Sequence, residues 1–299
     1  MANVDSISIV IAWVNPLELI VPGLKSLLEM QDRHPDEIIV VTRHGEEECK
    51  PLRALFTSVK LLRAPSGTPI TALRSMGLRE ARGSIVSVTE DHCIPGRDWV
   101  ARIEKWISRG CSVVGGPVEN DCTRRWRDWA AFLTEYAGAV RPAKGTVVNG
   151  LPGNNVAYRR ELIDGLCQTL DGGRWESFYH ESLQRRGIRM HFDPDMLVYH
   201  RRPSDFWYFI RQRYYFCRAF AGMRGPFRTL LDRCKYGFGS ALLPPVLMLR
   251  GLGNLIQRRR LVLRYVSCLP LIAAYMTVGA FGEMTGYFFG SGDALRRVE

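Results

Sequence analysis

Four short apolar runs alternate with helical patterns near the start of the chain, and this alternation constrains the fold most. The runs are Ile7–Val14, Glu37–Val41, Val59–Leu62 and Ser84–Val88. Ile7–Val14 is nearly continuously apolar, as a central parallel strand is, and the other three have the length of strands. Between them, apolar residues recur at helical spacing. Strands that alternate with helices predict an α/β fold with a Rossmann-like, mostly parallel central sheet.

Polar side chains follow the fourth run directly. Val86–Pro95 reads V-S-V-T-E-D-H-C-I-P, so Glu90, Asp91 and His92 stand at the end of a strand. Ligands of open α/β sheets bind outside the carboxyl ends of the strands. Carboxylates and imidazoles are ligands of divalent cations. This stretch is therefore either a cation site or a solvated turn with an acidic helix cap.

Length and composition limit the possible classes of protein. The chain has 299 residues, of which 46% are hydrophobic, enough for one large α/β domain and an appendage. Its eight cysteines include no C-x-x-C pair, which favours reduced thiols in a cytosolic setting. The first residues lack a basic segment, and we expect no signal peptide.

The positive charge is concentrated in one region. The formal net charge is +11, and residues 201–264 contain fourteen Lys or Arg against two acids. Apolar stretches surround these basic residues. We therefore expect an anionic membrane surface as a partner, and no nucleic acid.

The character of the chain changes at Ser204, which predicts an α/β domain at 1–203 and a helical, membrane-associated region at 204–299. Ser240–Leu249 is too short to span a bilayer, whereas Val266–Phe289 approaches the necessary length. If both segments crossed, the basic Arg258–Arg260 would face outward, against the positive-inside rule. We expect an interfacial or re-entrant first segment and an embedded or spanning second one. Two buried helices of a soluble protein are the alternative.

Several motifs occur in the order and spacing of a known family. They are the opening strand Ile7–Ile11, the helix end Ser26–Gln31, the run Arg74–Gly83, the acidic Glu90-Asp91-His92, Gly153-Asn154-Asn155, the acid-bearing Trp175–Glu181 and the strand end Val198-Tyr199-His200. In this combination the chain resembles the inverting glycosyltransferases of family 2, which have the GT-A fold. The motifs cover roughly the first two-thirds of the chain.

The resemblance implies transfer of a sugar from a nucleotide-diphosphate sugar to an acceptor hydroxyl, assisted by Mn²⁺ or Mg²⁺. It implies cation ligands at Asp91, His92 and His200. It further implies donor contacts from Glu90 and from four other residues, which are Arg74, Asn154, Arg211 and Arg213. Arg211 and Arg213 have a second interpretation, as part of a basic helix that lies on lipid.

The base that accepts the proton of the hydroxyl has two candidates, Glu176 and Glu181. In one helix they point in different directions, because they are five residues apart. Glu176 is favoured, since Trp175 and Phe178 predict an apolar surrounding for it. Glu181 has an alternative role as an exposed helix residue paired with Arg185.

Family members often have membrane-associated tails, which implies a lipid-linked or polysaccharide acceptor of the cell envelope. It also implies a place on the cytoplasmic face of the cell membrane, peripheral or with one embedded C-terminal segment. The chain departs from the family at Thr42-Arg43, where an acid is common, and in having E-D-H instead of D-x-D. These departures keep open a second hypothesis, a non-catalytic protein of the same fold that binds nucleotide sugar or membrane and serves a partner.

Overall fold

The computed structural model describes residues 5–141, 146–148, 150–224 and 229–298. The chain divides into two compact units. The first unit comprises Met1–Glu119 and Arg141–Arg201, and the second comprises Asn120–Val140 and Arg202–Glu299.

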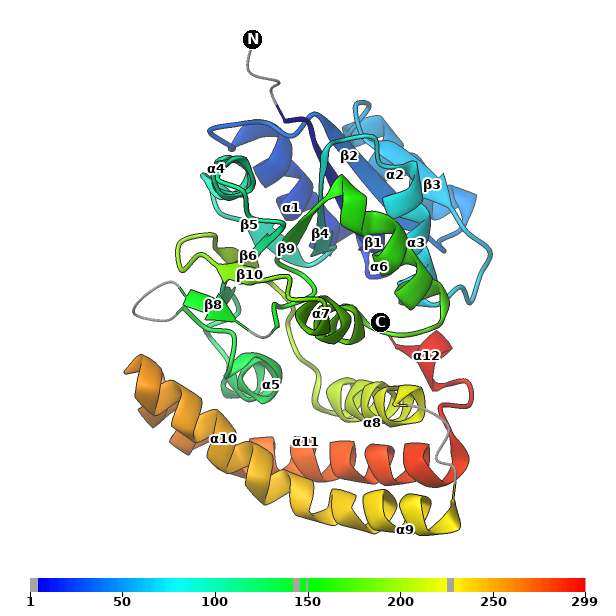
Figure 1. Cartoon of the computed structure of the whole chain (residues 1–299), viewed down its shortest axis with the longest axis vertical. Coiled ribbons are helices and arrows are strands. Elements are labelled where there is room, and N and C mark those ends of the chain that lie inside the picture. Colours follow the sequence, from blue (N-terminus) through cyan, green and yellow to red (C-terminus); the bar gives the residue numbers. More distant parts are fainter. Residues whose placement is uncertain (1–4, 142–145, 149, 225–228, 299) are drawn as a thin grey trace. The chain divides into compact units, whose positions relative to one another are not determined.

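The first unit contains two sheets and the helices that cover the larger one (Figure 1). Its strands are β1 (Ile7–Trp13), β2 (Glu37–Thr42), β3 (Lys60–Arg63), β4 (Ile85–Glu90), β5 (Cys93–Pro95), β6 (Val113–Gly115), β7 (Val118–Asn120, whose last residue is assigned to the second unit), β8 (Thr146–Val148), β9 (Val156–Arg159), β10 (Met190–Phe192) and β11 (Val198–His200). Its helices are α1 (Leu17–Glu29), α2 (Glu46–Leu55), α3 (Ile70–Glu80), α4 (Trp99–Ser108), the 3₁₀ turn η1 (Arg160–Leu162), α6 (Ile163–Asp171) and α7 (Glu176–Arg185).

The larger sheet has eight strands in the order β3-β2-β1-β4-β9-β6-β10-β8. Strands β3, β2, β1 and β4 are parallel, as the alternation in the sequence predicts. Strand β9 is antiparallel to both of its neighbours, β4 and β6. The alternation of strands and helices near the start of the chain does not extend to β9, and the sequence does not predict this strand. Strands β5, β11 and β7 form a separate three-stranded sheet.

Helices cover both faces of the larger sheet because its central strands are apolar on both sides. On β1, Ile7, Ile9 and Ile11 pack with α1, α2 and α4 in one core cluster. Val10 and Ala12 face the other way and pack with α3, α6 and α7. A strand that is buried on both faces reads as a continuous apolar run, which is why its position was predictable.

The second unit consists of helices: α5 (Trp126–Tyr136), α8 (Phe206–Met223), α9 (Leu230–Gly239), the 3₁₀ turn η2 (Ser240–Leu242), α10 (Leu243–Arg258), α11 (Val262–Phe289) and α12 (Ala294–Arg297). The predicted boundary at 203/204 lies close to the observed division after Arg201, but α5 belongs with the C-terminal helices. Its link to them includes the Arg264 guanidinium, 5.3 Å from the Trp129 ring centre.

Two segments of this unit are long and apolar enough to cross a membrane, Leu230–Arg258 and Val262–Phe289. The first is longer than the ten-residue segment that the sequence suggested, because α9, η2 and α10 follow one another without a break. Pro244 and Pro245 stand in the first turn of α10, where a missing backbone N–H removes no helical hydrogen bond. The two prolines therefore do not end the segment.

Helices α8 and α11 approach each other closely along glycines. A Cβ on Gly282 would lie 2.5 Å from the Tyr214 carbonyl oxygen, and one on Gly286 would lie 2.5 Å from that of Arg218. The contacts advance in the same direction along both helices, from Phe209 with Tyr275 to Arg218 with Gly286, so the two helices run parallel. Small residues are what permit backbones this close.

Candidate active site

The first unit gathers polar side chains at the carboxyl ends of β1 and β4. Ala12 on β1 is level with Glu90, the last residue of β4, so the residues that follow these two positions meet. His200 ends β11 and pairs with Cys93 on β5, which places it beside His92. The adjoining ends of β1 and β4 and the antiparallel pairing of β11 with β5 thus bring these polar residues together.

Asp91 is buried and accepts hydrogen bonds at both carboxylate oxygens. Its Oδ2 accepts the backbone N–H groups of Val14 and Asn15, each at 2.8 Å, and its Oδ1 accepts the Asn15 side-chain amide at 2.9 Å. Burial favours the neutral acid, but His92 and the two backbone donors outweigh it and lower the pKa of Asp91. The predicted role of Asp91 as a cation ligand would compete with these bonds.

His92 connects Asp91 to Glu90. Its Nδ1 lies 2.8 Å from Asp91 Oδ1, and its Nε2 lies 3.3 Å from Glu90 Oε2. An ionised carboxylate only accepts hydrogen bonds, so the proton between Asp91 and His92 belongs to Nδ1. The His200 ring stands edge-on to the His92 ring, with 4.6 Å between ring centres.

Glu90 is the most accessible member of this group, with its side chain 25% exposed. Its Oε1 accepts Arg74 Nη2 at 2.7 Å, and its Oε2 accepts Asn154 Nδ2 at 3.1 Å. Burial acts to raise the pKa of Glu90. The hydrogen bond and charge of His92 and the charges of Arg74 and His200 prevail, and the pKa is strongly lowered. Glu90 is therefore a carboxylate at neutral pH.

Arg74 joins Glu90 to Glu176 across a long sequence separation. Its Nη1 donates to Glu176 Oε1 at 2.6 Å, and only 2% of Arg74 and 3% of Glu176 is exposed. Burial would lower the pKa of Arg74, but the two carboxylates raise it above its ordinary value. The Arg74 guanidinium also lies 5.8 Å from the Trp175 ring centre. The surrounding of Glu176 is therefore less apolar than the sequence predicts.

The G-N-N segment covers this ion pair. A Cβ on Gly153 would lie 3.0 Å from Glu176 Oε2 and 3.4 Å from Arg74 Nη1, so glycine lets the backbone pass close to both. Asn154 contacts Glu90, whereas Asn155 donates to the carbonyls of Pro117 and Met196 and has a structural role.

Glu181 lies on the exposed side of α7. Its side chain is 62% exposed and forms a 3.7 Å ion pair with Arg185, the alternative that the sequence left open. Of the two candidate bases, the structure joins Glu176 to the buried group.

Arg211 and Arg213 belong to α8 of the second unit. The Arg211 guanidinium lies 5.8 Å from the Tyr208 ring centre. Arg213 is close to Cys217, Glu135 and Glu283; burial lowers its pKa, and these neighbours raise it above the ordinary value. Their contact with a diphosphate stays a prediction.

Glu90, His92 and Cys93 each offer a donor atom, and these three atoms lie within 4.8 Å of one another. A carboxylate oxygen suits Mn²⁺ or Mg²⁺, and an imidazole nitrogen suits a transition-metal cation better than Mg²⁺. The Cys93 thiol suits them less, because burial and the charge of Glu90 raise its pKa well above the ordinary value. The residues thus fit a divalent cation through Glu90 and His92.

Sequence reasoning missed two members of the site, Asn15 and Cys93. Asn15 directly follows β1, whose end must adjoin that of β4 in a parallel sheet, so this position carried a usable signal. The position of the Cys93 thiol depends on the pairing of β5 with β11, which local patterns do not reveal.

The profile of Glycosyl transferase family 2 matches residues 8–166, more than half of the chain. The chain belongs to glycosyl transferase family 2. It is a glycosyltransferase, and its mostly parallel sheet with C-terminal helices has the predicted GT-A fold. No curated protein sequence matches it significantly.

Solved structures agree with the family 2 fold. The mannosyltransferase PcManGT from Pyrobaculum calidifontis, in complex with GDP-Man and Mn²⁺, superimposes with a TM-score of 0.56 at 18% identity, over 94% of this chain and 88% of that one. Residues 1–349 of TarS from S. aureus superimpose with a TM-score of 0.50 at 13% identity, over 95% of this chain and 92% of that one. At these identities the likeness concerns the fold.

Proposed function

We propose that this glycosyltransferase uses Mn²⁺ or Mg²⁺ to transfer a sugar, with inversion, from a nucleotide-diphosphate sugar to a hydroxyl of a lipid-linked or cell-envelope acceptor. The observation that carries the proposal is the position of Arg74. It holds Glu90, a cation-ligand candidate, and Glu176, a base candidate, in one buried group. PcManGT, whose structure holds GDP-Man and Mn²⁺, supports this class of donor and cation.

In this proposal Glu90 and His92 are cation ligands, with His200 beside them. Asp91 has a positioning role: it holds the Nδ1 proton of His92 and so directs Nε2 towards Glu90. Carboxylates commonly orient metal-binding histidines in this way. A cation bound there would compensate the negative charge of the departing diphosphate. Asn154 and Arg74 would complete the donor contacts.

Glu176 is the proposed base. The acceptor oxygen forms a bond to the anomeric carbon from the face opposite the diphosphate, while the bond from that carbon to the diphosphate oxygen breaks. The electron pair of the broken bond leaves with the nucleoside diphosphate, and the hydroxyl proton passes to the Glu176 carboxylate.

The second unit supports the proposed acceptor class. Its excess of basic residues and its two long apolar segments support attachment to an anionic membrane, and we place the enzyme at the cytoplasmic face. An enzyme at a membrane surface meets lipid-linked and envelope acceptors.

The test is turnover of a panel of nucleotide sugars with Mn²⁺, followed as release of nucleoside diphosphate. Wild-type protein should release it from at least one donor, and the Glu90→Gln variant should release it at least about 100-fold more slowly. A protein that binds a nucleotide sugar but never turns it over, with any acceptor extract, would instead support the non-catalytic alternative.

A further inference from the structure

We propose that α9, η2 and α10 lie flat in the surface of an anionic bilayer, and that neither long apolar segment crosses it. This inference rests on the membrane attachment proposed above and specifies how it is achieved. The sequence suggested an embedded or spanning second segment, and the present inference replaces it with a surface-bound arrangement.

One face of the Leu230–Arg258 segment is apolar and exposed along its whole length. Leu231, Phe238, Leu242, Leu249 and Ile256 are 78, 66, 68, 70 and 55% exposed, and we call them the apolar stripe. Their spacing of seven, four, seven and seven residues keeps them on one side of a helix. Only 17% of the most apolar window of this segment is buried within the protein. Such a stripe needs a partner.

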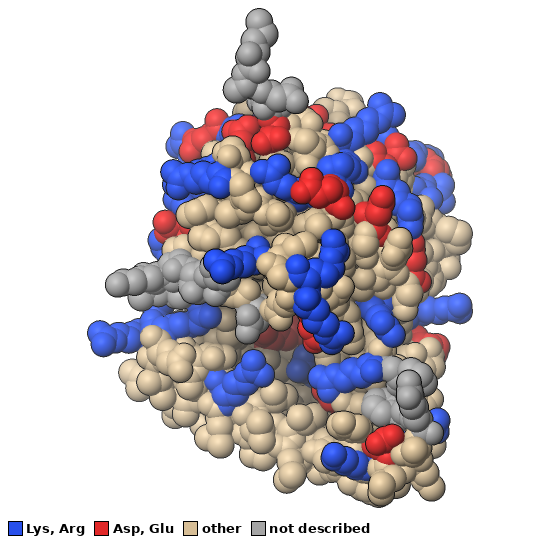
Figure 2. All heavy atoms as spheres, in the orientation of Figure 1, with Lys and Arg blue, Asp and Glu red and all other residues tan. Residues whose placement is uncertain are grey.

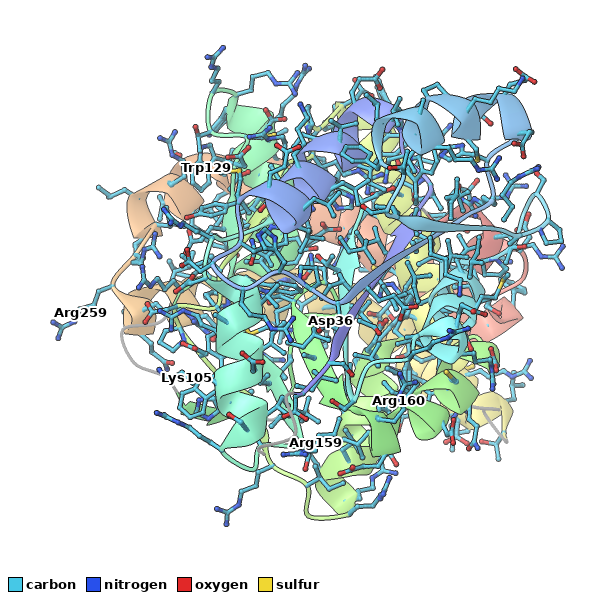
Figure 3. The ribbon with its side chains drawn as sticks, turned by 90° about the horizontal axis from the view of Figure 1, so that it is seen from above. Asp36, Lys105, Trp129, Arg159, Arg160 and Arg259 are labelled. Carbon is cyan, nitrogen blue, oxygen red and sulfur yellow. The ribbon has the colours of Figure 1, made fainter. Side chains whose placement is uncertain are left out.

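The charge around the stripe favours anionic lipid as that partner. Residues 229–264 contain seven Lys or Arg and a single acid, Asp232. Arg259 is exposed in the turn after α10 and points away from the protein (Figure 3). In Figure 2 the lower edge, where Figure 1 places α9 and α10, is mainly uncharged, with a few basic and acidic side chains. Amphipathic helices of this composition lie in the membrane interface.

Helix α11 is apolar enough to span, but the protein already covers much of it. Its buried share is 44% over the most apolar window. Cys268 lies 3.8 Å from the Trp126 carbonyl of α5, and Gly282 and Gly286 lie against the α8 backbone. α5 and α8 are not lipid-like partners, because they carry Arg127, Glu135 and several arginines.

The turn between α10 and α11 is bound to the residues that follow α5 within the second unit. Arg258 Nη2 donates to the Gly138 carbonyl at 2.7 Å, and Arg258 Nη1 donates to that of Val140. The next residue, Arg141, already belongs to the first unit. We infer that the turn stays on the side of the bilayer where the chain continues from Val140 into the first unit.

With the turn fixed there, α11 can cross the bilayer only if its C-terminal end reaches the other side. α8 runs parallel to α11 and is bound to that end, where Arg218 Nε donates to the Gly290 carbonyl at 3.3 Å. α8 would have to cross as well, with Arg211, Arg213 and Arg218. Arginines inside the hydrocarbon region are costly, which favours the arrangement along the surface.

Vesicle flotation of the full chain tests the lipid contact. Wild-type protein should float with vesicles of phosphatidylcholine and phosphatidylglycerol, and much less with pure phosphatidylcholine. Leu242→Asp/Leu249→Asp should lower binding at least about tenfold. Met30→Asp/Leu55→Asp is the matched control, because both residues are 60% exposed but belong to the first unit. It should bind like the wild type, and melting curves should show that both variants are folded.

A topology assay tests the orientation. Protease sites are placed after Arg260 and at the C-terminus, and protease is added to sealed right-side-out and to sealed inverted membrane vesicles. Both sites should be cleaved in the vesicles that expose the first unit to the protease. Protection of either site on that side would overturn the surface-bound arrangement.

The outcomes distinguish failure of this inference from failure of the proposed membrane attachment. If the wild type floats and the stripe variant floats equally well, the stripe is not the lipid contact and the inference fails while membrane attachment stands. If the wild type floats with no vesicle, both fail. If the wild type is a dimer and the stripe variant is a monomer, the apolar stripe binds a second copy of the chain, and this result would also overturn the inference. Donor turnover with a soluble acceptor is measured separately and does not depend on any of these results.

Discussion

Arg74 and Glu176 are 102 residues apart in the chain, yet Arg74 Nη1 lies 2.6 Å from Glu176 Oε1, and both side chains are almost completely buried. Arg74 comes from α3 and Glu176 from the start of α7, so this ion pair fixes one helix against the other beside the end of β4. A buried pair of this kind need not stabilise a protein, but breaking it leaves an uncompensated charge.

Arg74→Met should therefore lower the free energy of unfolding by about 3–5 kcal/mol, measured by chemical denaturation. Arg79→Met on the same helix is the matched control, because the Arg79–Asp171 pair is exposed, and it should cost less than about 1 kcal/mol. The double variant Arg74→Met/Glu176→Leu should recover part of the loss. Equal effects of the two single substitutions would contradict the account of the buried pair.

Glu176→Gln should reduce the transfer rate by about 100- to 10,000-fold, because the amide cannot accept the acceptor proton. Glu181→Gln should remain near the wild-type rate, since Glu181 is exposed and pairs with Arg185. Initial rates under saturating donor are the measurement. A greater loss of transfer rate in the Glu181 variant than in the Glu176 variant would identify Glu181 as the base.

Cation binding should distinguish the residues around Glu90. Glu90→Gln and His92→Ala should each abolish calorimetric binding of Mn²⁺, because they remove ligands. Asp91→Asn should weaken binding about 10- to 100-fold through the orientation of His92. Cys93→Ser serves as the control and should bind Mn²⁺ normally, since its thiol stays protonated. Normal binding by the His92 variant would show that the imidazole is not a ligand.

His180 should make the protein less stable in mild acid. Burial lowers its pKa from 6.5 to about 4, while the unfolded chain keeps the ordinary value. Between these values the unfolded state binds a proton that the native state does not, so the free energy of unfolding falls as the pH falls from about 6.5 to 4. Between pH 7 and pH 5 this amounts to about 2 kcal/mol.

His180→Asn isolates this contribution, because the carboxylates that also titrate are unchanged. Its unfolding free energy should fall by about 2 kcal/mol less than that of the wild type over the same interval. If both proteins lose stability equally, His180 is not the group responsible.

Much of the fold was predictable from the sequence for a physical reason. Strands such as β1, buried on both faces, give continuous apolar runs, and the carboxyl ends of parallel strands must adjoin one another. The proximity of Glu90 to the residues that follow β1 came from that geometry, whereas His200 reaches His92 through the antiparallel pairing of β11 with β5 in the smaller sheet. The antiparallel strand β9 was missed because a short segment such as Val156–Arg159 acquires its conformation from pairing with β4 and β6.

Other features depend on tertiary contacts and leave little trace in the local sequence. α5 joins the C-terminal helices through long-range contacts such as that of Arg264 with Trp129. The hydrogen bonds of Asp91 depend on the position of the β1 loop, and the partner of Arg74 depends on the docking of α7. Residue types and spacing identified these polar side chains as candidates for the functional site, but they did not indicate which side chains would contact one another.

The binding of nucleoside diphosphates with and without Mn²⁺, followed by thermal shift, tests the central claim most directly. The account predicts that at least one diphosphate stabilises the wild type only when the cation is present, by about 2.7 kcal/mol at a hundred times its dissociation constant. The same pair should fail to stabilise Glu90→Gln. Stabilisation that is equal without the cation, or equal in the Glu90 variant, would contradict a cation-assisted diphosphate site at the end of β4.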